Sequence, residues 1–307
     1  MSAPAAAGAS GSSGWVRAMP TVFVLIWSTG FIVARYGMPY APPMKFLAIR
    51  YALSLLAFGI WVALARVAWP RTRTQWLHLA VTGVFMQAGY LGGVWAAVRV
   101  GMGSGLVALL VGIQPVLTAI WLSSRGGAIS KRQWAGLMLG FAGLVMVVWR
   151  KLGQGGEVTA ASMSLAVLAL VSITVGTLYQ KRFVAPCDVR SASMVQLAAA
   201  LVVSLPFALI EPDPFQWNAS SAGAMAWSVL ALTLGGSSLL YILIQRGSAT
   251  AVTSLLYLVP PCTALMAWLL FGEPITALTV AGIAITAVGV SMVVREQRNQ
   301  ETQGASR

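Results

Sequence analysis

Residues 247–274 read GSATAVTSLLYLVPPCTALMAWLLFGEP, an apolar segment that is interrupted near its middle by two adjacent prolines. A helix needs about 20 apolar residues to cross the hydrocarbon core of a bilayer, and this segment is long enough. Pro260 and Pro261 lack the backbone N–H of a helix interior, so they free carbonyl groups that neighbours or water must satisfy. The pattern therefore predicts a membrane helix that is broken at mid-depth.

An earlier part of the chain repeats this segment at a constant distance. Subtracting 146 relates Gly247 to Gly101 and Pro261 to Pro115. The same offset continues without a gap in both directions, and it also relates Gly176 to Gly30, Gly282 to Gly136 and Gly289 to Gly143. This regularity predicts two tandem repeats.

Composition indicates an integral membrane protein. Hydrophobic residues make up 58% of the 307 residues and charged residues only 9%, whereas about 25% are charged in a typical soluble domain. The short alternating segments of a membrane β-barrel are absent from the sequence. We predict an all-α polytopic fold with ten transmembrane helices, at 16–34, 46–65, 76–98, 102–122, 132–149, 162–180, 192–210, 222–244, 249–271 and 276–294.

The odd number of spans in each repeat decides how the halves are related. After the five spans of repeat 1 (15–150), the chain is on the side of the membrane opposite to where it began. Repeat 2 (161–294) therefore enters the membrane from that side, with inverted topology. Inverted repeats are typical of secondary transporters, with the substrate near the midplane between the halves. We expect the tail at 1–14 and the polar tail at 295–307 to be disordered.

The net charge of +13 is explained by membrane topology. With both termini in the cytoplasm, 14 of the 20 basic residues fall on the cytoplasmic side: Arg17, Arg66, Arg71, Arg73, Arg125, Lys131, Arg132, Lys181, Arg182, Arg190, Arg246, Arg295, Arg298 and Arg307. The remaining six are Arg35, Lys45, Arg50, Arg99, Arg150 and Lys151. This bias is the positive-inside rule, so the sequence gives no reason to expect a nucleic-acid partner. We expect the inner or plasma membrane as location.

Larger polar and aromatic side chains near the middle of the spans are the candidate lining of a substrate cavity. A mostly apolar cavity with a few placed polar groups is the usual form of a small-molecule site. We predict substrate-binding roles for Trp27, Ser28, Arg50, Gln87, Tyr90, Gln114, Tyr241 and Tyr257. We predict hinge or gating roles for Pro115, Pro260, Pro261 and Glu273.

The chain resembles the EamA-type members of the drug/metabolite transporter superfamily. The residues that carry the resemblance are WSTGF at 27–31, Arg35, Arg50, Pro115, Pro261, Gly272-Glu273, Gly282 and Gly289. It implies ten helices in two five-helix repeats and transport of small metabolites through a cavity lined by the spans other than five and ten. Where that family often has Gly-Glu in repeat 1 this chain has Gly126-Gly127, so any role of the acid rests on Glu273.

The sequence offers little for catalysis or for a cofactor. The single histidine, His78, has no neighbouring serine or acid pattern, and the predicted topology keeps Cys187 and Cys262 apart. We therefore expect no enzyme activity, no cofactor and no metal site. A channel and a lipid scramblase stay open as alternatives on the same scaffold. Gly136 and Gly140 predict a fifth span that packs closely on another helix or on a second copy, which leaves a homodimer open.

Energy coupling is predicted from the position of the acids. None of the seven lies in the middle of a predicted span, and Glu273 alone is close to a span end. Proton-driven carriers commonly use an ionisable group within the membrane. We expect export or facilitated exchange without a transported proton, with Glu273 stabilising a helix start or, alternatively, gating the cavity.

Overall fold

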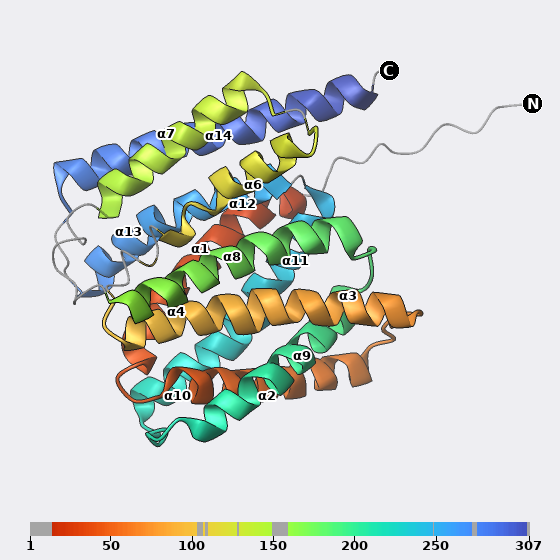
Figure 1. Ribbon diagram of the computed structural model, residues 1–307, viewed down its shortest axis with the longest axis vertical. Helices are drawn as coiled ribbons and strands as arrows, with labels where there is room; N and C mark the ends of the chain where they lie inside the picture. Colours follow the sequence, from red (N-terminus) through yellow and green to blue (C-terminus); the bar gives the residue numbers. More distant parts are fainter. Residues whose placement is uncertain are drawn as a thin grey trace, which may run out of the picture.

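The computed structural model describes residues 14–102, 107, 110–127, 129–148, 159–247, 249–271 and 275–305, and the regular secondary structure of this part of the chain is helical (Figure 1). The first half contains α1 (Gly14–Gly37), α2 (Pro43–Leu64), α3 (Arg73–Gly83), the π-helix η1 (Val84–Gly89), α4 (Tyr90–Arg99), α6 (Gln114–Ser124) and α7 (Lys131–Val148). The second half contains α8 (Ala160–Phe183), α9 (Val189–Ile210), α10 (Ala219–Trp227), the π-helix η3 (Ser228–Ser237), α11 (Ser238–Arg246), α12 (Ala249–Ser254), the 3₁₀ turn η4 (Leu255–Leu258), α13 (Val259–Phe271) and α14 (Ala277–Ala305).

Seven helical stretches of the described chain are long and apolar enough to cross a membrane, which supports the prediction of a multi-pass membrane protein. Three further predicted spans, 16–34, 102–122 and 132–149, overlap α1, α6 and α7. Large apolar side chains on the spanning helices are exposed, with Leu64 at the end of α2 at 83% and Ile210 at the end of α9 at 77%. Such surfaces are rare on soluble monomers and suit contact with lipid.

The two halves begin their helices at equivalent positions. Thr72 caps α3 by accepting a hydrogen bond from the Gln75 N–H at 3.2 Å, and Asn218, 146 residues later, caps α10. The Ser130 hydroxyl accepts from the Gln133 N–H at the start of α7, and the equivalent Thr276 does the same for α14. The π-helices η1 and η3 also overlap under this offset. Local sequence therefore builds similar helices in both halves.

The helices form a bundle with a pair at each end of its long axis. The pair α7–α14 lies at one end and α2–α9 at the other, with the remaining helices between them (Figure 1). In this middle layer α1 contacts η3 and α13, and α8 contacts η1 and α6. Because α8 corresponds to α1, η1 to η3 and α6 to α13, each contact has an equivalent in the other half.

Glycines hold α7 and α14 close together. A Cβ on Gly136 would lie 2.8 Å from the Gly289 carbonyl oxygen, and one on Gly143 would lie 2.7 Å from the Gly282 carbonyl oxygen. The offset of 146 relates Gly136 to Gly282 and Gly289 to Gly143, so the two contacts are equivalent. Backbones this close leave no room for a side chain, so the close packing predicted for the fifth span is made with the tenth.

Replacing Gly289 with alanine is expected to lower the melting temperature of the purified protein by several degrees. The new Cβ would lie 2.5 Å from the backbone nitrogen of Gly140, and overpacking of this kind costs about 1 to 3 kcal/mol. Gly223→Ala is the matched control, because a Cβ there meets nothing within 4 Å and alanine favours a helix by about 1 kcal/mol over glycine. Equal melting temperatures of the two variants would contradict this packing.

One expectation about the helices needs correction. The C-terminal tail after Val294 is helical, since α14 continues to Ala305. Arginine, glutamate and glutamine are good helix formers, and extending an existing helix avoids the cost of nucleation. The break predicted at the prolines coincides with helix starts: Pro115 lies in the first turn of α6, and Pro260 and Pro261 follow Val259, where α13 begins after η4. A first turn needs no N–H donor there. The N-terminal tail to residue 13 and Glu273 lie outside the described residues.

Candidate functional site

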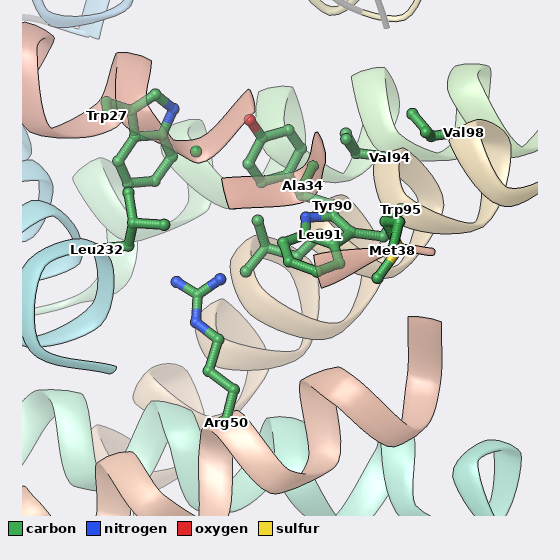
Figure 2. Close-up of a pocket in the computed structure, with 11 residues that line it drawn as sticks. Trp27, Ala34, Met38, Arg50, Tyr90, Leu91, Val94, Trp95, Val98 and Leu232 are labelled. Carbon is green, nitrogen blue, oxygen red and sulfur yellow. The ribbon is translucent and has the colours of Figure 1, made fainter. Parts of the chain in front are cut away.

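A small pocket lies between α1, α2, α4 and η3, and it brings together three of the predicted site residues, Trp27, Arg50 and Tyr90 (Figure 2). Its free volume of about 60 Å³ has room for roughly four water-sized spheres. Helices must therefore move apart before a metabolite can enter. The lining consists of Trp27, Gly30, Ala34, Met38, Arg50, Tyr90, Leu91, Val94, Trp95, Val98 and Leu232.

Arg50 supplies the only charge in this lining. Its side chain is 3% exposed, and its Nε donates a hydrogen bond to Thr233 Oγ1 at 2.8 Å. Figure 2 shows the terminal nitrogens pointing into the space between Leu232 and Leu91. No carboxylate of the described residues pairs with Arg50. A buried cation without an acidic partner is costly, and a bound anion would provide the missing charge.

Aromatic rings form the walls beside this guanidinium. Trp27 and Tyr90 stack with ring centroids 6.4 Å apart and an interplanar angle of 4°. Farther along α4, Trp95 packs against Phe46 of α2 with ring centroids 4.7 Å apart. The result is an apolar pocket with one fixed cation, an arrangement that suits a ligand with an apolar part and a carboxylate.

Two buried glutamines occupy the repeat-related positions of the Arg50–Thr233 pair. The offset of 146 relates Arg50 to Gln196 and Thr233 to Gln87, and both glutamines are 6% exposed. Gln196 Nε2 and Gln87 Oε1 have no hydrogen-bond partner among the described residues. Gln196 and Thr233 are not among the site residues predicted from the sequence. Applying the repeat offset to Arg50 and Gln87 would have identified them.

Ser28 and Gln114, both predicted to line the cavity, instead join helices. The Ser28 hydroxyl lies 2.6 Å from the Val24 carbonyl oxygen and 3.3 Å from that of Val259 and shares its single proton between them, which ties α1 to α13. Gln114 Nε2 donates to Thr177 Oγ1 at 3.2 Å, which ties α6 to α8. The Oε1 atom of Gln114 is buried without a partner in the described chain, so it could bind a polar group once the helices separate.

Tyr241 and Tyr257 lie apart from the pocket lining. Tyr257 is fully buried, and its ring packs against Gly140 of α7. A Cβ on Gly140 would lie 2.6 Å from this ring. The Tyr241 hydroxyl lies 3.1 Å from the Cys187 sulfur, and its side chain packs in a cluster with Leu79 of α3. The structure therefore brings Trp27, Arg50 and Tyr90 together and leaves these two tyrosines in helix contacts.

A carboxylate from the second half caps the start of α2 in the first half. The Glu211 side chain accepts hydrogen bonds from the backbone N–H groups of Met44 at 2.9 Å and Lys45 at 2.8 Å. In return, Lys45 Nζ donates to the carbonyl oxygens of Glu211 at 2.7 Å and Asp213 at 2.6 Å. An acid at a helix N-terminus satisfies free N–H groups and complements the helix dipole.

An ion pair extends this contact to α4. Arg99 Nη2 donates to Asp213 Oδ2 at 2.8 Å, and Arg99 Nη1 donates to the Met38 carbonyl oxygen at 3.4 Å. Met38 also lines the pocket. We call Lys45, Arg99, Glu211 and Asp213 the charged network. It joins the two halves at the end of the pocket that is predicted to face outward.

The opposite end of the bundle carries neutral contacts at the related positions. Ser191, which corresponds to Lys45, donates to a loop carbonyl at 2.8 Å. Gln245, which corresponds to Arg99, donates to the Val184 carbonyl oxygen at 3.3 Å. At these related positions, one end therefore carries charged side chains and the other end neutral ones.

The profile of the EamA-like transporter family matches this sequence twice, at residues 19–149 and 160–295. The chain belongs to the EamA-like transporter family. The resemblance inferred from residues 27–31, Arg50 and the proline-containing helices is thereby confirmed.

Curated relatives of this EamA-like protein are named as transporters. The "Uncharacterized transporter YvbV" of Bacillus subtilis is 26% identical over 289 residues, which cover 91% of each chain. The "Probable amino-acid metabolite efflux pump" of Salmonella typhimurium is 24% identical over 297 residues, covering 92% of this chain and 96% of the relative. The "Uncharacterized inner membrane transporter YedA" of Escherichia coli K12 is 24% identical over 274 residues, covering 88% and 87%.

A solved crystal structure supports the same fold for this EamA-like chain. It superposes with a TM-score of 0.76 and 18% sequence identity, covering 94% of this chain and all of the other. At this identity the likeness concerns the fold alone. The family and the names of the relatives indicate a membrane transporter, not an enzyme.

Proposed function

We propose that this protein is a secondary transporter that moves a small organic metabolite by alternating access of two inverted five-helix repeats, 15–150 and 161–294. The observation that carries the proposal is that equivalent helices of the two halves make equivalent contacts with the other half. α1 contacts η3 and α13, and the equivalent α8 contacts η1 and α6. Such pairs support a pseudo-two-fold axis in the membrane plane, which allows two alternative packings around one central site.

In the proposed mechanism, the charged network keeps the pocket closed toward the external side of the membrane. With Glu211 on the start of α2 and Asp213 on Arg99, the halves are joined at the predicted external end. Rocking of one repeat against the other would break these bonds and widen the pocket. The helix breaks at Pro115 and Pro261 provide hinge positions on the equivalent helices, because the chain changes there between separate helical segments.

The substrate class follows from the pocket and from the relatives. Arg50 offers a cation for a carboxylate, and Trp27 and Tyr90 offer apolar faces. Gln87 and Gln196 carry unpartnered polar atoms for a further polar group. Because relatives are named amino-acid metabolite efflux pumps, we propose an amino acid or a metabolite derived from one as substrate, moved outward by export or exchange across the inner or plasma membrane. Both termini are placed in the cytoplasm in this proposal.

A panel of labelled amino acids and related carboxylates tests the proposal with purified protein in liposomes. The expected result is saturable uptake of at least one compound that also raises the melting temperature, because a ligand bound only by the folded state stabilises it. Conductance without saturation would favour the channel, and movement of labelled lipid without any substrate would favour the scramblase.

An imposed pH gradient is expected to leave the steady-state level of a neutral or zwitterionic substrate unchanged. No acid lines the described pocket, and a transported proton commonly needs an ionisable group within the membrane. Uptake is compared with and without the gradient for the wild type and Glu273→Gln. Accumulation driven by the gradient and lost in that variant would overturn exchange without protons and assign the coupling to Glu273.

A further inference from the structure

A second concave site lies on the surface of the α7–α14 pair, at the end where α7 begins. It encloses about 430 Å³ and is lined by Arg132, Ala287, Val288, Ser291, Met292 and Arg295. The residues from α14 recur at spacings of three and four, so they share one face of the helix. The residues from 287 to 295 rise about 12 Å along the axis, at 1.5 Å per residue.

The groove is cationic at one end and apolar at the other. Arg295 and Arg132 lie at the end of the bundle that carries most basic residues, and Ala287 and Val288 lie deeper along the span. The Arg132 side chain is 54% exposed, and its Nη1 is 3.9 Å from Glu296 Oε2. That distance is the outer limit of an ion pair, so both guanidinium groups keep donors for another anion.

We propose that this groove binds an anionic phospholipid, with its phosphate on Arg132 and Arg295 and an acyl chain along Ala287, Val288 and Met292. Basic pockets between membrane helices at the cytoplasmic surface bind anionic headgroups. A free phosphate would use only the arginines, whereas a phospholipid also covers the apolar half of the groove. The site lies on a different helix pair from the pocket, so its failure would leave the transport proposal untouched.

The repeat provides an internal comparison. The offset of 146 places Leu278 at the position of Arg132, Val145 at that of Ser291 and Trp149 at that of Arg295. Neither of the positions equivalent to Arg132 and Arg295 carries an arginine, and Trp149, Arg150 and Lys151 lie outside the described residues.

Lipid binding is measured by native mass spectrometry and by melting temperature in detergent, with phosphatidylglycerol and phosphatidylcholine of identical chains. Phosphatidylglycerol is expected to bind the wild type on the order of 10-fold more tightly, because each basic residue near the surface contributes about 1 kcal/mol. The double variant Arg132→Gln, Arg295→Gln should lose this preference, and Arg132→Lys, Arg295→Lys should retain most of it. Arg71→Gln, Arg73→Gln is the matched control and should behave like the wild type.

Three outcomes would overturn the proposal. These are equal binding of both lipids by the wild type, a preference that survives in the glutamine double variant, and competition by millimolar inorganic phosphate. The last would identify a site for a free anion. Because both arginines are at the surface, the variants should have the same melting temperature as the wild type without added lipid. A lower melting temperature of the lysine variant would count against the arginines binding the lipid through their charge.

Discussion

Arg50→Gln is expected to lower kcat/KM for substrate uptake on the order of 100-fold, because losing one partner of a buried charge pair costs about 2 to 5 kcal/mol. The guanidinium is 3% exposed and bonded only to Thr233 among the described residues. In the proposed complex it pairs with the substrate carboxylate. Initial uptake rates over a range of substrate concentrations measure the effect in proteoliposomes.

Stability distinguishes a binding role of Arg50 from a structural one. No carboxylate of the described chain is left unpaired when Arg50 is removed, so the melting temperature should stay the same or rise. Arg50→Lys should recover only part of the uptake, because lysine lacks the planar fork that binds a carboxylate in two places. Arg66→Gln is the surface control. Unchanged kinetics in Arg50→Gln, or a fall in its melting temperature that matches the loss of uptake, would contradict this role.

Cross-linking the external end is expected to stop transport completely and reversibly. The variant Arg99→Cys, Asp213→Cys replaces the ion pair whose atoms lie 2.8 Å apart, in a background where Cys187 and Cys262 are serine. A short reducible cross-linker would then hold the two halves together at this end. Alternating access requires them to separate there, so uptake should fall to the level of protein-free liposomes and return after reduction.

A local pair of residues provides the control for the cross-link. Asp188 and Arg190 form an ion pair at 2.7 Å within the start of α9, and the Arg190 guanidinium holds the pKa of the Asp188 carboxyl below its usual value. Cross-linking Asp188→Cys, Arg190→Cys joins nothing across the repeats and should leave uptake unchanged. Full uptake by the cross-linked external pair would show that this end does not open during transport.

The sequence predicted the helices better than the site, for a physical reason. Apolar runs of about 20 residues and the offset of 146 locate the spans because the bilayer demands length and hydrophobicity. They do not reveal which face of a span points inward, since lipid is as apolar as the protein interior. Tyr241 and Tyr257 were therefore assigned to the cavity by depth alone, and they pack against other helices.

Residues from loops and from the second half were the hardest to predict. Glu211 and Asp213 follow α9, and nothing local in the sequence relates them to Lys45 and Arg99. Only the fold brings them together, over more than 100 positions. Gln196 was predictable from the sequence, because the repeat offset makes it the equivalent of Arg50.

Counterflow in proteoliposomes tests alternating access around one central site most directly. Liposomes are loaded with an excess of unlabelled substrate identified in the uptake panel, and a trace of labelled substrate is added outside. A carrier that exposes one site to one side at a time should accumulate label transiently above its equilibrium level, and Arg50→Gln should not. Equilibration of label without an overshoot, at a rate independent of the internal substrate, would contradict the account.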